Sequence, residues 1–293
     1  MSRRDKARAS AAGASSQTPP AGGDLQDRIL ERERLAARMS RIKRKMLVLS
    51  GKGGVGKSTV AANLALALAT AGKRVGLLDV DIHGPSIPAL LGLEGRSPAG
   101  TGTALLPVPF DGRLQVMSIG FLLGHRDDAV IWRGPLKMKV IQQFLGDVEW
   151  GDLDYLVVDC PPGTGDEPLS VVQLIEGADG AIVVTTPQRL AISDVRKCIR
   201  FCQRLDLPVL GVIENMSGFI CPHCGKRVDI FKAGGGEAMA DEMDVPFLGR
   251  IPIDPRIVEA SDSGTPYVKA YAESEAARAF GEILGLLSEH EAH

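Results

Sequence analysis

Residues 51–59 read Gly51-Lys52-Gly53-Gly54-Val55-Gly56-Lys57-Ser58-Thr59, and they connect an aliphatic run at 46–50 to a stretch with helical spacing at 58–71. A strand, a glycine-rich turn and a helix that opens with Lys-Ser are typical of a phosphate-binding loop. The glycines let the backbone turn its N–H groups towards phosphate oxygens, and the helix N-terminus adds partial positive charge. We therefore predict a nucleotide site formed by Gly51, Gly53, Gly54, Val55, Gly56, Lys57, Ser58 and Thr59.

Three side chains of this loop have distinct expected roles. Lys57 is expected to reach the β- and γ-phosphates, which makes it a catalytic candidate. The Ser58 hydroxyl is expected to ligate Mg²⁺, and Thr59 to hydrogen-bond the α-phosphate. The alternative is a glycine-rich turn without a ligand, which leaves the combination of strand, loop, helix and Lys-Ser-Thr unexplained.

Outward from the loop, short aliphatic runs alternate with helical stretches. Strands that alternate with helices predict βαβ units, and hence an α/β fold with a mostly parallel twisted sheet flanked by helices on both faces. Ligands bind such sheets at the carboxyl ends of the strands, where the motifs described below all lie. The predicted strands are 46–50, 74–79, 114–119, 155–159, 180–185, 209–214 and 247–250, and the predicted helices include 58–71, 135–145 and 192–205.

Composition limits the class of protein. The 293 residues are 44% hydrophobic and 24% charged, close to ordinary globular usage, and only 4% aromatic, so the core is aliphatic. No run approaches about 18 apolar residues, which predicts no membrane span. The five cysteines do not form a disulfide framework. These features predict a cytoplasmic protein.

The first 45 residues contain 12 Lys/Arg and 5 Asp/Glu, although the whole chain has a net charge of −2. The basic excess therefore lies in a tail rather than in the body, which argues against a nucleic-acid enzyme with a basic channel. Residues 1–23 predict a disordered tail, with a transit peptide as the alternative. We expect residues 24–44 to form a basic helix and residues 45–290 to form a single ATPase domain.

Two carboxylates follow predicted strands. One strand ends at Asp79-Val80-Asp81, where we expect Asp81 to orient or deprotonate the attacking water and Asp79 to support the loop or the outer shell of the metal. The alternative is an acidic turn that caps the next helix. The strand at 155–159 ends at Asp159, which is expected to act near Mg²⁺.

Pro161-Pro162-Gly163 follows Asp159. The Gly163 N–H is expected to bind the γ-phosphate and to move when that group is lost, which describes a switch segment. The alternative is an ordinary strand followed by a Pro-Gly turn.

A cysteine pair lies at Cys221-Pro222-His223-Cys224-Gly225. This spacing lets two thiolates converge on one metal centre, but it also suits a redox dithiol or half of a zinc knuckle. There is no second Cys-x-x-Cys, and Cys198 and Cys202 suit packing on a helix. One chain thus offers two of the four ligands that a cluster or zinc needs, so the spacing predicts a metal centre between two copies and leaves iron and zinc open.

With Lys52 at its start as well as Lys57 at its end, the loop resembles that of the deviant Walker A family, which includes MinD, the nitrogenase iron protein and the Mrp ATPases. The resemblance implies that Lys52 reaches the nucleotide of a partner subunit and neutralises charge as the γ-phosphoryl leaves. It also implies that Asn215, in Glu214-Asn215-Met216-Ser217, hydrogen-bonds adenine, and that the run near Pro252 covers the other face of the base. The alternatives are a surface lysine and a turn asparagine.

Glu214-Asn-Met-Ser followed by Cys-Pro-x-Cys, together with Lys52 and the motif at 159–166, resembles the Mrp/ApbC iron–sulfur cluster carriers over residues 45–288. The resemblance implies a weak ATP hydrolase that uses ATP and Mg²⁺ and is a homodimer. It implies a [4Fe–4S] cluster shared by Cys221 and Cys224 of two subunits, in a metal loop at 216–228. The expected partners are apo iron–sulfur proteins and an assembly scaffold. Residues 1–159 lack cysteine, so the four-cysteine N-terminal site of some relatives is not matched.

Two other functions remain open. A MinD- or ParA-like spatial regulator with a structural zinc would need a membrane or DNA contact, but residues 272–293 contain five Glu and one Arg, unlike a basic lipid anchor. We therefore expect no stable membrane association and no nucleic acid. Electron transfer, as in the nitrogenase iron protein, uses cysteines from two separate loops, whereas here both lie in one Cys-x-x-Cys.

Overall fold

The computed structural model describes residues 29–30, 33–102, 104–122, 134–175, 177–221 and 223–289. The tail expected at 1–23 and the first part of the expected basic helix, 24–28, lie outside the described residues. None of the helices in the described ranges combines the length and hydropathy that a membrane span requires.

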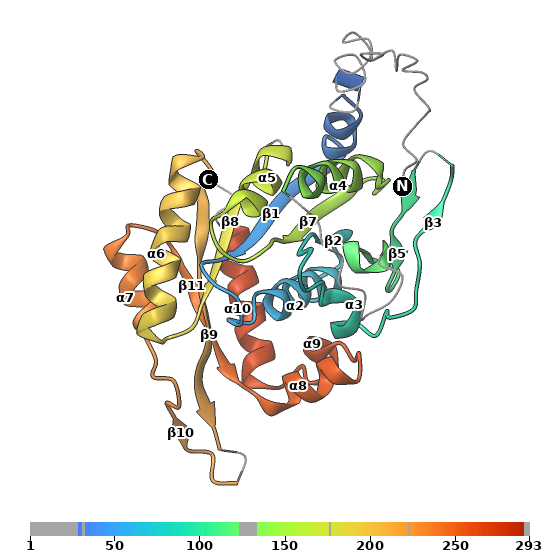
Figure 1. The fold of residues 1–293 in the computed structure, drawn as a ribbon. Coiled ribbons are helices and arrows are strands. Elements are labelled where there is room, and N and C mark those ends of the chain that lie inside the picture. The colour runs from blue at the N-terminus through green and yellow to red at the C-terminus, as the bar shows by residue number, and fades with distance from the viewer. Residues whose placement is uncertain are drawn as a thin grey trace, which may run out of the picture.

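A single mostly parallel sheet forms the centre of the molecule (Figure 1). Its order is β10-β9-β8-β1-β7-β2-β6-β5, and β11 pairs with β9 beside this path. Among the described strands of this sheet, only β5 and β10 join it in the antiparallel sense. The prediction of a mostly parallel sheet is confirmed. The strands are β1 Ile42–Ser50, β2 Val75–Asp79, β5 Val108–Pro109, β6 Leu114–Ser118, β7 Leu153–Asp159, β8 Gly180–Thr185, β9 Val209–Ile220, β10 Arg227–Val228 and β11 Phe247–Ile253, with β3 Ala99–Gly100 and β4 Leu105–Leu106 in a separate ribbon.

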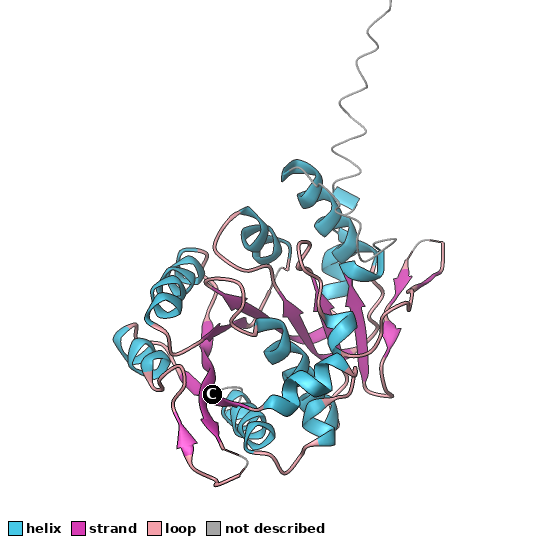
Figure 2. Cartoon of the chain, turned by 60° about the horizontal axis from the view of Figure 1, so that its bottom comes forward, coloured by secondary structure: helices cyan, strands magenta, loops and turns pink. Residues whose placement is uncertain are grey.

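Helices cover both faces of the sheet (Figure 2). Alternate residues of β1 belong to different cores: Met46 and Val48 pack in one, Leu47 and Leu49 in the other. This follows from the period of two along a strand, and it explains why the central strands are hydrophobic throughout. The first layer holds α2 Lys57–Thr70, α3 Ile87–Leu90, α8 Pro255–Asp262, α9 Tyr267–Ala270 and α10 Glu275–Glu289, and the second holds α4 Gly134–Asp147, α5 Asp166–Leu174, α6 Arg189–Arg204 and α7 Gly235–Glu242.

The expected helix at 24–44 is wrong in its last residues. Residues 33–39 are helical, but β1 begins at Ile42. The helix is anchored because Leu35 and Met39 are buried in the second core. Ile42 is also buried, and its backbone pairs with Leu153 of β7. Pairing with a central strand therefore overrides the helical preference of this basic segment.

The strand expected at 209–214 is longer than predicted, because β9 continues to Ile220. Its extension pairs Phe219 with Ile253 of β11 and with Val228 of β10. Met216 and Gly218 both have positive φ, 57° and 79°, and the register with β11 shifts nearby. The segment expected as a loop at 216–228 is therefore a hairpin of β9 and β10, which projects from the sheet (Figure 1).

Candidate functional site

The phosphate-binding loop leaves β1 and enters α2, as the sequence predicts. Gly54 and Gly56 have φ of 80° and 81°, a left-handed conformation that favours glycine. Gly51 is required for a different reason: a Cβ there would lie 2.3 Å from the carbonyl oxygen of Asp194 on α6. Gly53 and Gly54 face open space. The loop is therefore held against α6 at its start and open at its middle.

A buried ion pair lies below the loop. Lys57 Nζ is 2.5 Å from Asp159 Oδ1 at the end of β7, and 3.9 Å from Asp81 Oδ2. Burial raises the pKa of the Asp159 carboxyl, while Lys57 and the hydroxyl of Ser58 oppose that rise. Four side chains predicted for nucleotide and metal chemistry thus meet at one point.

The same cluster provides donors suited to Mg²⁺. Asp159 Oδ2 is buried and has no hydrogen-bond partner in the part of the chain that the structure describes. The Ser58 hydroxyl and the Asp81 carboxylate lie beside it. Carboxylate and hydroxyl oxygens are the hard ligands that Mg²⁺ prefers. These residues fit the ion, and their metal role stays a prediction.

Asp79 anchors the loop that carries Asp81. Its carboxylate accepts hydrogen bonds from Ser118 Oγ at 2.9 Å and from the backbone N–H groups of Asp81 at 3.1 Å and Ile87 at 3.3 Å. Full burial, followed by the charge of Asp159, raises its pKa to about 8. Sequence reasoning missed Ser118, although a polar residue at the end of a predicted strand was the available signal.

The Gly163 N–H already makes a hydrogen bond within the protein. This N–H, expected to meet the γ-phosphate, donates to the carbonyl of Ser50 at 2.8 Å, at the end of β1. A γ-phosphate at this N–H would therefore have to replace an existing hydrogen bond.

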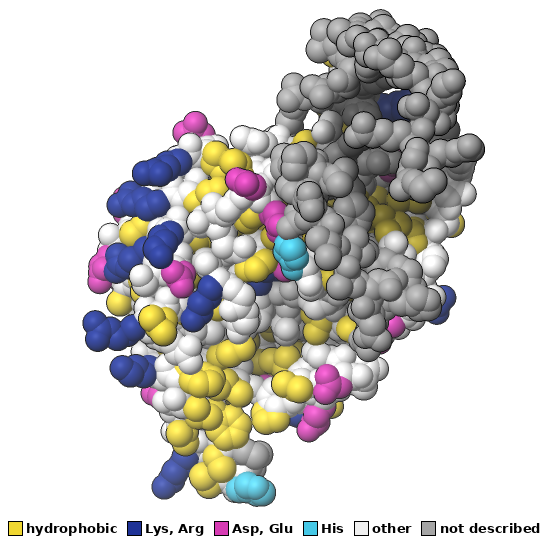
Figure 3. Space-filling view, viewed as in Figure 1, with side chains coloured by type: hydrophobic (Ala, Val, Ile, Leu, Met, Phe, Trp, Pro, Cys, Tyr) yellow, Lys and Arg dark blue, Asp and Glu magenta, His cyan; other side chains and the backbone are white. Residues whose placement is uncertain are grey.

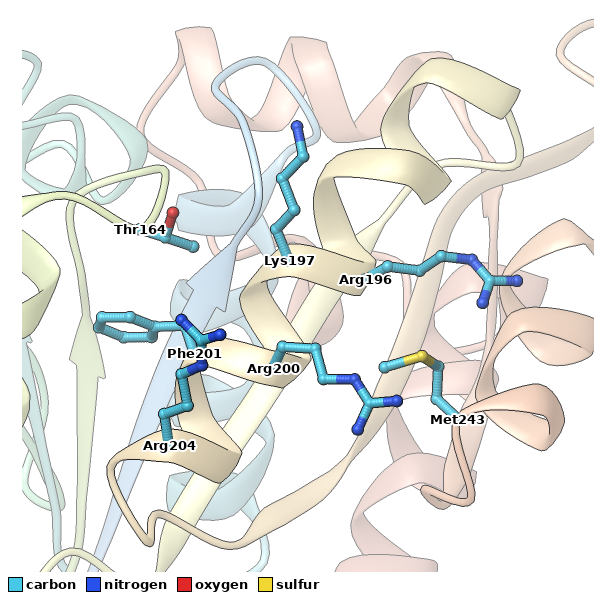
Figure 4. A pocket seen from close by; sticks show the side chains of 7 residues that line it. All are labelled: Thr164, Arg196, Lys197, Arg200, Phe201, Arg204 and Met243. Atoms are coloured by element: carbon cyan, nitrogen blue, oxygen red, sulfur yellow. The ribbon is translucent and has the colours of Figure 1, made fainter.

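The next residue, Thr164, lines a hollow of about 630 Å³ beside α6 (Figure 4). Arg196, Lys197, Arg200 and Arg204 also border the hollow and come from α6, not from the phosphate-binding loop. These cations belong to the surface next to the switch segment.

Lys52 lies at the start of the loop and is half-buried. Its side chain has no hydrogen bond or ion pair with any residue that the structure describes. Only its backbone carbonyl is engaged, by Ser50 Oγ at 2.9 Å. The ammonium therefore has no partner among the described residues, and its action on a partner subunit stays a prediction.

Asn215 is not a turn residue, because it lies inside β9. Its Nδ2 donates to the carbonyl of Val55 in the phosphate-binding loop at 2.9 Å, and a Cβ on Gly56 would lie 2.2 Å from that nitrogen. Pro252 follows Ile251, the residue of β11 that pairs with Asn215. The structure thus places Asn215 against the loop and Pro252 on the neighbouring strand, and their contacts with adenine stay predictions.

The cysteine pair lies at the turn of the β9–β10 hairpin. Cys221 is half-buried and Cys224 is exposed. The Cys221 N–H donates to Lys226 O at 3.0 Å, which closes the turn. Hydrogen bonds from the backbone N–H groups of His223 and Cys224, and from the Cys224 thiol, lower the pKa of the Cys221 thiol. A lowered pKa favours the thiolate, the form that binds metal.

The two thiols form only part of a metal site. No group of three potential metal-ligating side chains occurs within the described ranges. Cys198 and Cys202 are buried, as expected for packed residues. Cys160 is buried as well, and burial raises the pKa of its thiol. Hydrophobic side chains gather over the lower part of the molecule that bears the hairpin (Figure 3). Val228, Ile230 and Phe231 are among the exposed ones.

A sequence model of the ParA family, described as that of the NUBPL iron-transfer P-loop NTPases, matches residues 41–287. The chain belongs to that family. The resemblance and the fold class predicted from the sequence are thereby confirmed. A MinD cell division ATPase and, with the fold alone in common, a ParA family ATPase are also among its structural neighbours.

Two curated proteins are similar to this chain in sequence. An iron-sulfur cluster carrier protein of Methanocaldococcus jannaschii is 55% identical over 230 residues, which cover 78% of this chain and 79% of the relative. A cytosolic Fe-S cluster assembly factor NUBP2 homolog of Trichoplax adhaerens is 51% identical over 248 residues, covering 83% and 94%.

Two solved structures extend the comparison. A nucleotide-binding protein of Archaeoglobus fulgidus, in complex with ADP and with cobalt, superposes with a TM-score of 0.71 at 43% identity over 80% of this chain and 92% of that one. The cell division ATPase MinD of Pyrococcus furiosus superposes with a TM-score of 0.62 at 27% identity over 84% and 99%.

Proposed function

We propose that this chain is an ATP-dependent iron–sulfur cluster carrier of the cytoplasm, which holds a [4Fe–4S] cluster between two copies of itself and delivers it to apo-proteins. The observation that carries the proposal is the pair of half-buried Cys221 and exposed Cys224, with a lowered thiol pKa at Cys221, on the same chain as a phosphate-binding loop. The names of the two curated relatives support a cluster rather than zinc as the cargo.

ATP is the substrate of the phosphate-binding loop in this proposal. Lys57 leaves Asp159 to contact the β- and γ-phosphates, and Asp81 orients the attacking water. Ser58 and Asp159 would hold Mg²⁺, which when bound would neutralise charge that develops on the phosphates. Lys52 of the partner copy adds a second cation at the same point. Hydrolysis then releases the Gly163 segment to the Ser50 contact that the structure shows.

The cluster is the cargo of the hairpin. Two thiolates from each copy complete a four-cysteine site, which is the usual ligand set of a [4Fe–4S] cluster. This arrangement requires a homodimer with the two hairpins facing each other. It also leaves the cluster at the edge of the molecule, where an acceptor protein or an assembly scaffold can approach it.

The test is anaerobic purification with iron and zinc analysis and a visible spectrum. The wild type is expected to contain about two iron atoms per chain, as one four-iron cluster shared by two chains requires, and to be a dimer. Cys221→Ala should lose the iron and its visible absorbance. His223→Ala is the matched control, because His223 is exposed between the cysteines and should keep the iron. A wild type that contains zinc and no iron would contradict the proposal that the chain carries an iron–sulfur cluster, and would favour a spatial regulator with a structural zinc.

A further inference from the structure

Glu214 is a charged residue in the middle of β9 with no exposure to solvent. It precedes Asn215, and it is separated from the cysteine pair by six residues of the same strand. Neither the phosphate chemistry nor the cysteine site uses it. A buried carboxylate is expensive unless its oxygens are fully hydrogen-bonded, so its contacts show what it supports.

Both oxygens of Glu214 hold the segment that returns from the hairpin. Oε1 accepts hydrogen bonds from the Gly234 N–H at 2.8 Å and from Ser217 Oγ at 2.6 Å, and Oε2 accepts from the Gly236 N–H at 2.5 Å. Arg250 Nε lies 3.7 Å from Oε1. Glu214 therefore ties the start of α7 to β9, so that the outgoing and returning arms of the hairpin meet at one carboxylate.

The outgoing arm is fastened at a second point. The Ser217 carbonyl accepts a hydrogen bond from Arg227 Nη2 at 3.0 Å. The same guanidinium lies against Gly218, where a Cβ would be 2.7 Å from it. Arg227 begins β10, three residues after Cys224. The positions of the cysteines thus depend on two linked anchors, Glu214 with Ser217, and Ser217 with Arg227.

Asn215, the adjacent residue of β9, faces the phosphate-binding loop. Successive side chains of a strand point in opposite directions. Glu214 points to α7, whereas the Asn215 amide donates to the carbonyl of Val55 in the phosphate-binding loop at 2.9 Å. Any displacement of the Val55 carbonyl therefore acts, through Asn215, on the backbone next to Glu214. The Glu214 side chain in turn binds both arms of the hairpin.

We propose that Glu214 is a positioning residue that couples occupancy of the phosphate-binding loop to the placement of Cys221 and Cys224. The proposal rests on the proposed function, because it needs nucleotide and cargo on one chain. The proposed coupling depends on the two acceptor oxygens of the carboxylate and not only on the volume of the side chain. An amide has a single acceptor oxygen, so glutamine would leave one of the two glycine N–H groups facing its NH₂ group.

The test measures how fast iodoacetamide alkylates the two hairpin thiols in reduced, metal-free protein, with and without Mg-ATPγS, by mass spectrometry. The other three cysteines are buried and do not compete. In the wild type, nucleotide should change the rate by about fivefold, the lower range of ordinary site coupling. In Glu214→Gln the ratio should fall to about one, with nucleotide affinity changed by less than about twofold.

Glu242→Gln is the matched control, because it removes an exposed carboxylate from the same helix, α7, and should keep the wild-type ratio. Ser217→Ala removes a single contact of Glu214 and should lower the ratio part of the way, which preserves the test if Glu214→Gln is poorly folded. A purely structural role would change both rates equally and leave their ratio intact.

An unchanged ratio in Glu214→Gln overturns the inference. A wild type in which nucleotide binds without altering the alkylation rate also overturns it. In both cases iron content and ATP hydrolysis, measured separately, still decide the proposed function.

Discussion

Replacing Lys57 with methionine removes one charge from a pair that the fold buries almost completely. The Lys57 side chain is 6% exposed and that of Asp159 is 0% exposed, and their charged atoms are 2.5 Å apart. Methionine keeps most of the apolar stem, so the main change is the loss of a countercharge. We expect the protein without nucleotide to be less stable, in addition to losing its affinity for ATP.

The size of the loss follows from the contacts that remain. Removing one partner of a buried ion pair costs about 3–5 kcal/mol, because it leaves an uncompensated charge. Ser58 still hydrogen-bonds Asp159, and a carboxyl with a raised pKa can take up a proton, so we expect about 3 kcal/mol at pH 7. Lys57→Met raises the pKa of Asp159 further. The folded state then binds more protons than the unfolded state, and the loss grows as the pH rises.

A double-mutant cycle separates this effect from general damage. Asp159→Asn should cost only about 1 kcal/mol, because Lys57 retains Asp81 at 3.9 Å. The double variant should be more stable than Lys57→Met by about 2 kcal/mol, although it still fails to bind nucleotide. The assay is urea denaturation of the wild type and three variants followed by circular dichroism, with exposed Lys73→Met as the control. Additive costs within about 0.5 kcal/mol would show that the pair does not stabilise the fold.

Three further predictions concern the same site. Gly51→Ala forces a Cβ against the Asp194 carbonyl and should cost about 1–3 kcal/mol in urea denaturation, whereas Gly53→Ala meets open space and should cost less than about 1 kcal/mol. Burial raises the pKa of Asp79 to about 8 in the folded state, well above the ordinary value for an aspartate, so the wild type should lose about 2 kcal/mol of stability relative to Asp79→Asn as the pH rises from about 6 to 8; a constant difference would contradict the raised pKa. Lys52→Ala should keep its nucleotide affinity and lose about 10³-fold in hydrolysis, measured by phosphate release; unchanged turnover would exclude the trans-acting lysine.

The parallel sheet was predictable because its central strands are aliphatic on both faces. Their carboxyl ends carry the phosphate-binding loop, Asp81 and Asp159, so the sequence also located most of the candidate site. The start of β1 was not predictable, because Lys43, Arg44 and Lys45 continue the basic character of the preceding helix. The register of Ile42 with β7 decides that boundary, and it is a tertiary contact.

The extension of β9 beyond residue 214 could not be predicted from the sequence for a related reason. Its polar and glycine residues after 214 lack the alternation of a strand, and Met216 and Gly218 interrupt it with positive φ. Pairing with β10 and β11 holds it extended nevertheless. Glu214 was missed because its partners Gly234 and Gly236 lie 20 and 22 residues away, where no local pattern indicates them.

Three groups expected to meet ATP or Mg²⁺ already have partners within the protein. Lys57 donates a hydrogen bond to the Asp159 carboxylate, the Gly163 N–H donates to the Ser50 carbonyl, and the Asn215 amide donates to the Val55 carbonyl. A ligand shifts a conformational equilibrium only through differential contacts with the two states. Nucleotide binding at this site therefore exchanges one set of hydrogen bonds for another. Because Asn215 lies on β9, the strand that leads to Cys221, that exchange has a covalent route to the cysteine pair. Glu214, the residue before Asn215, binds both arms of the hairpin.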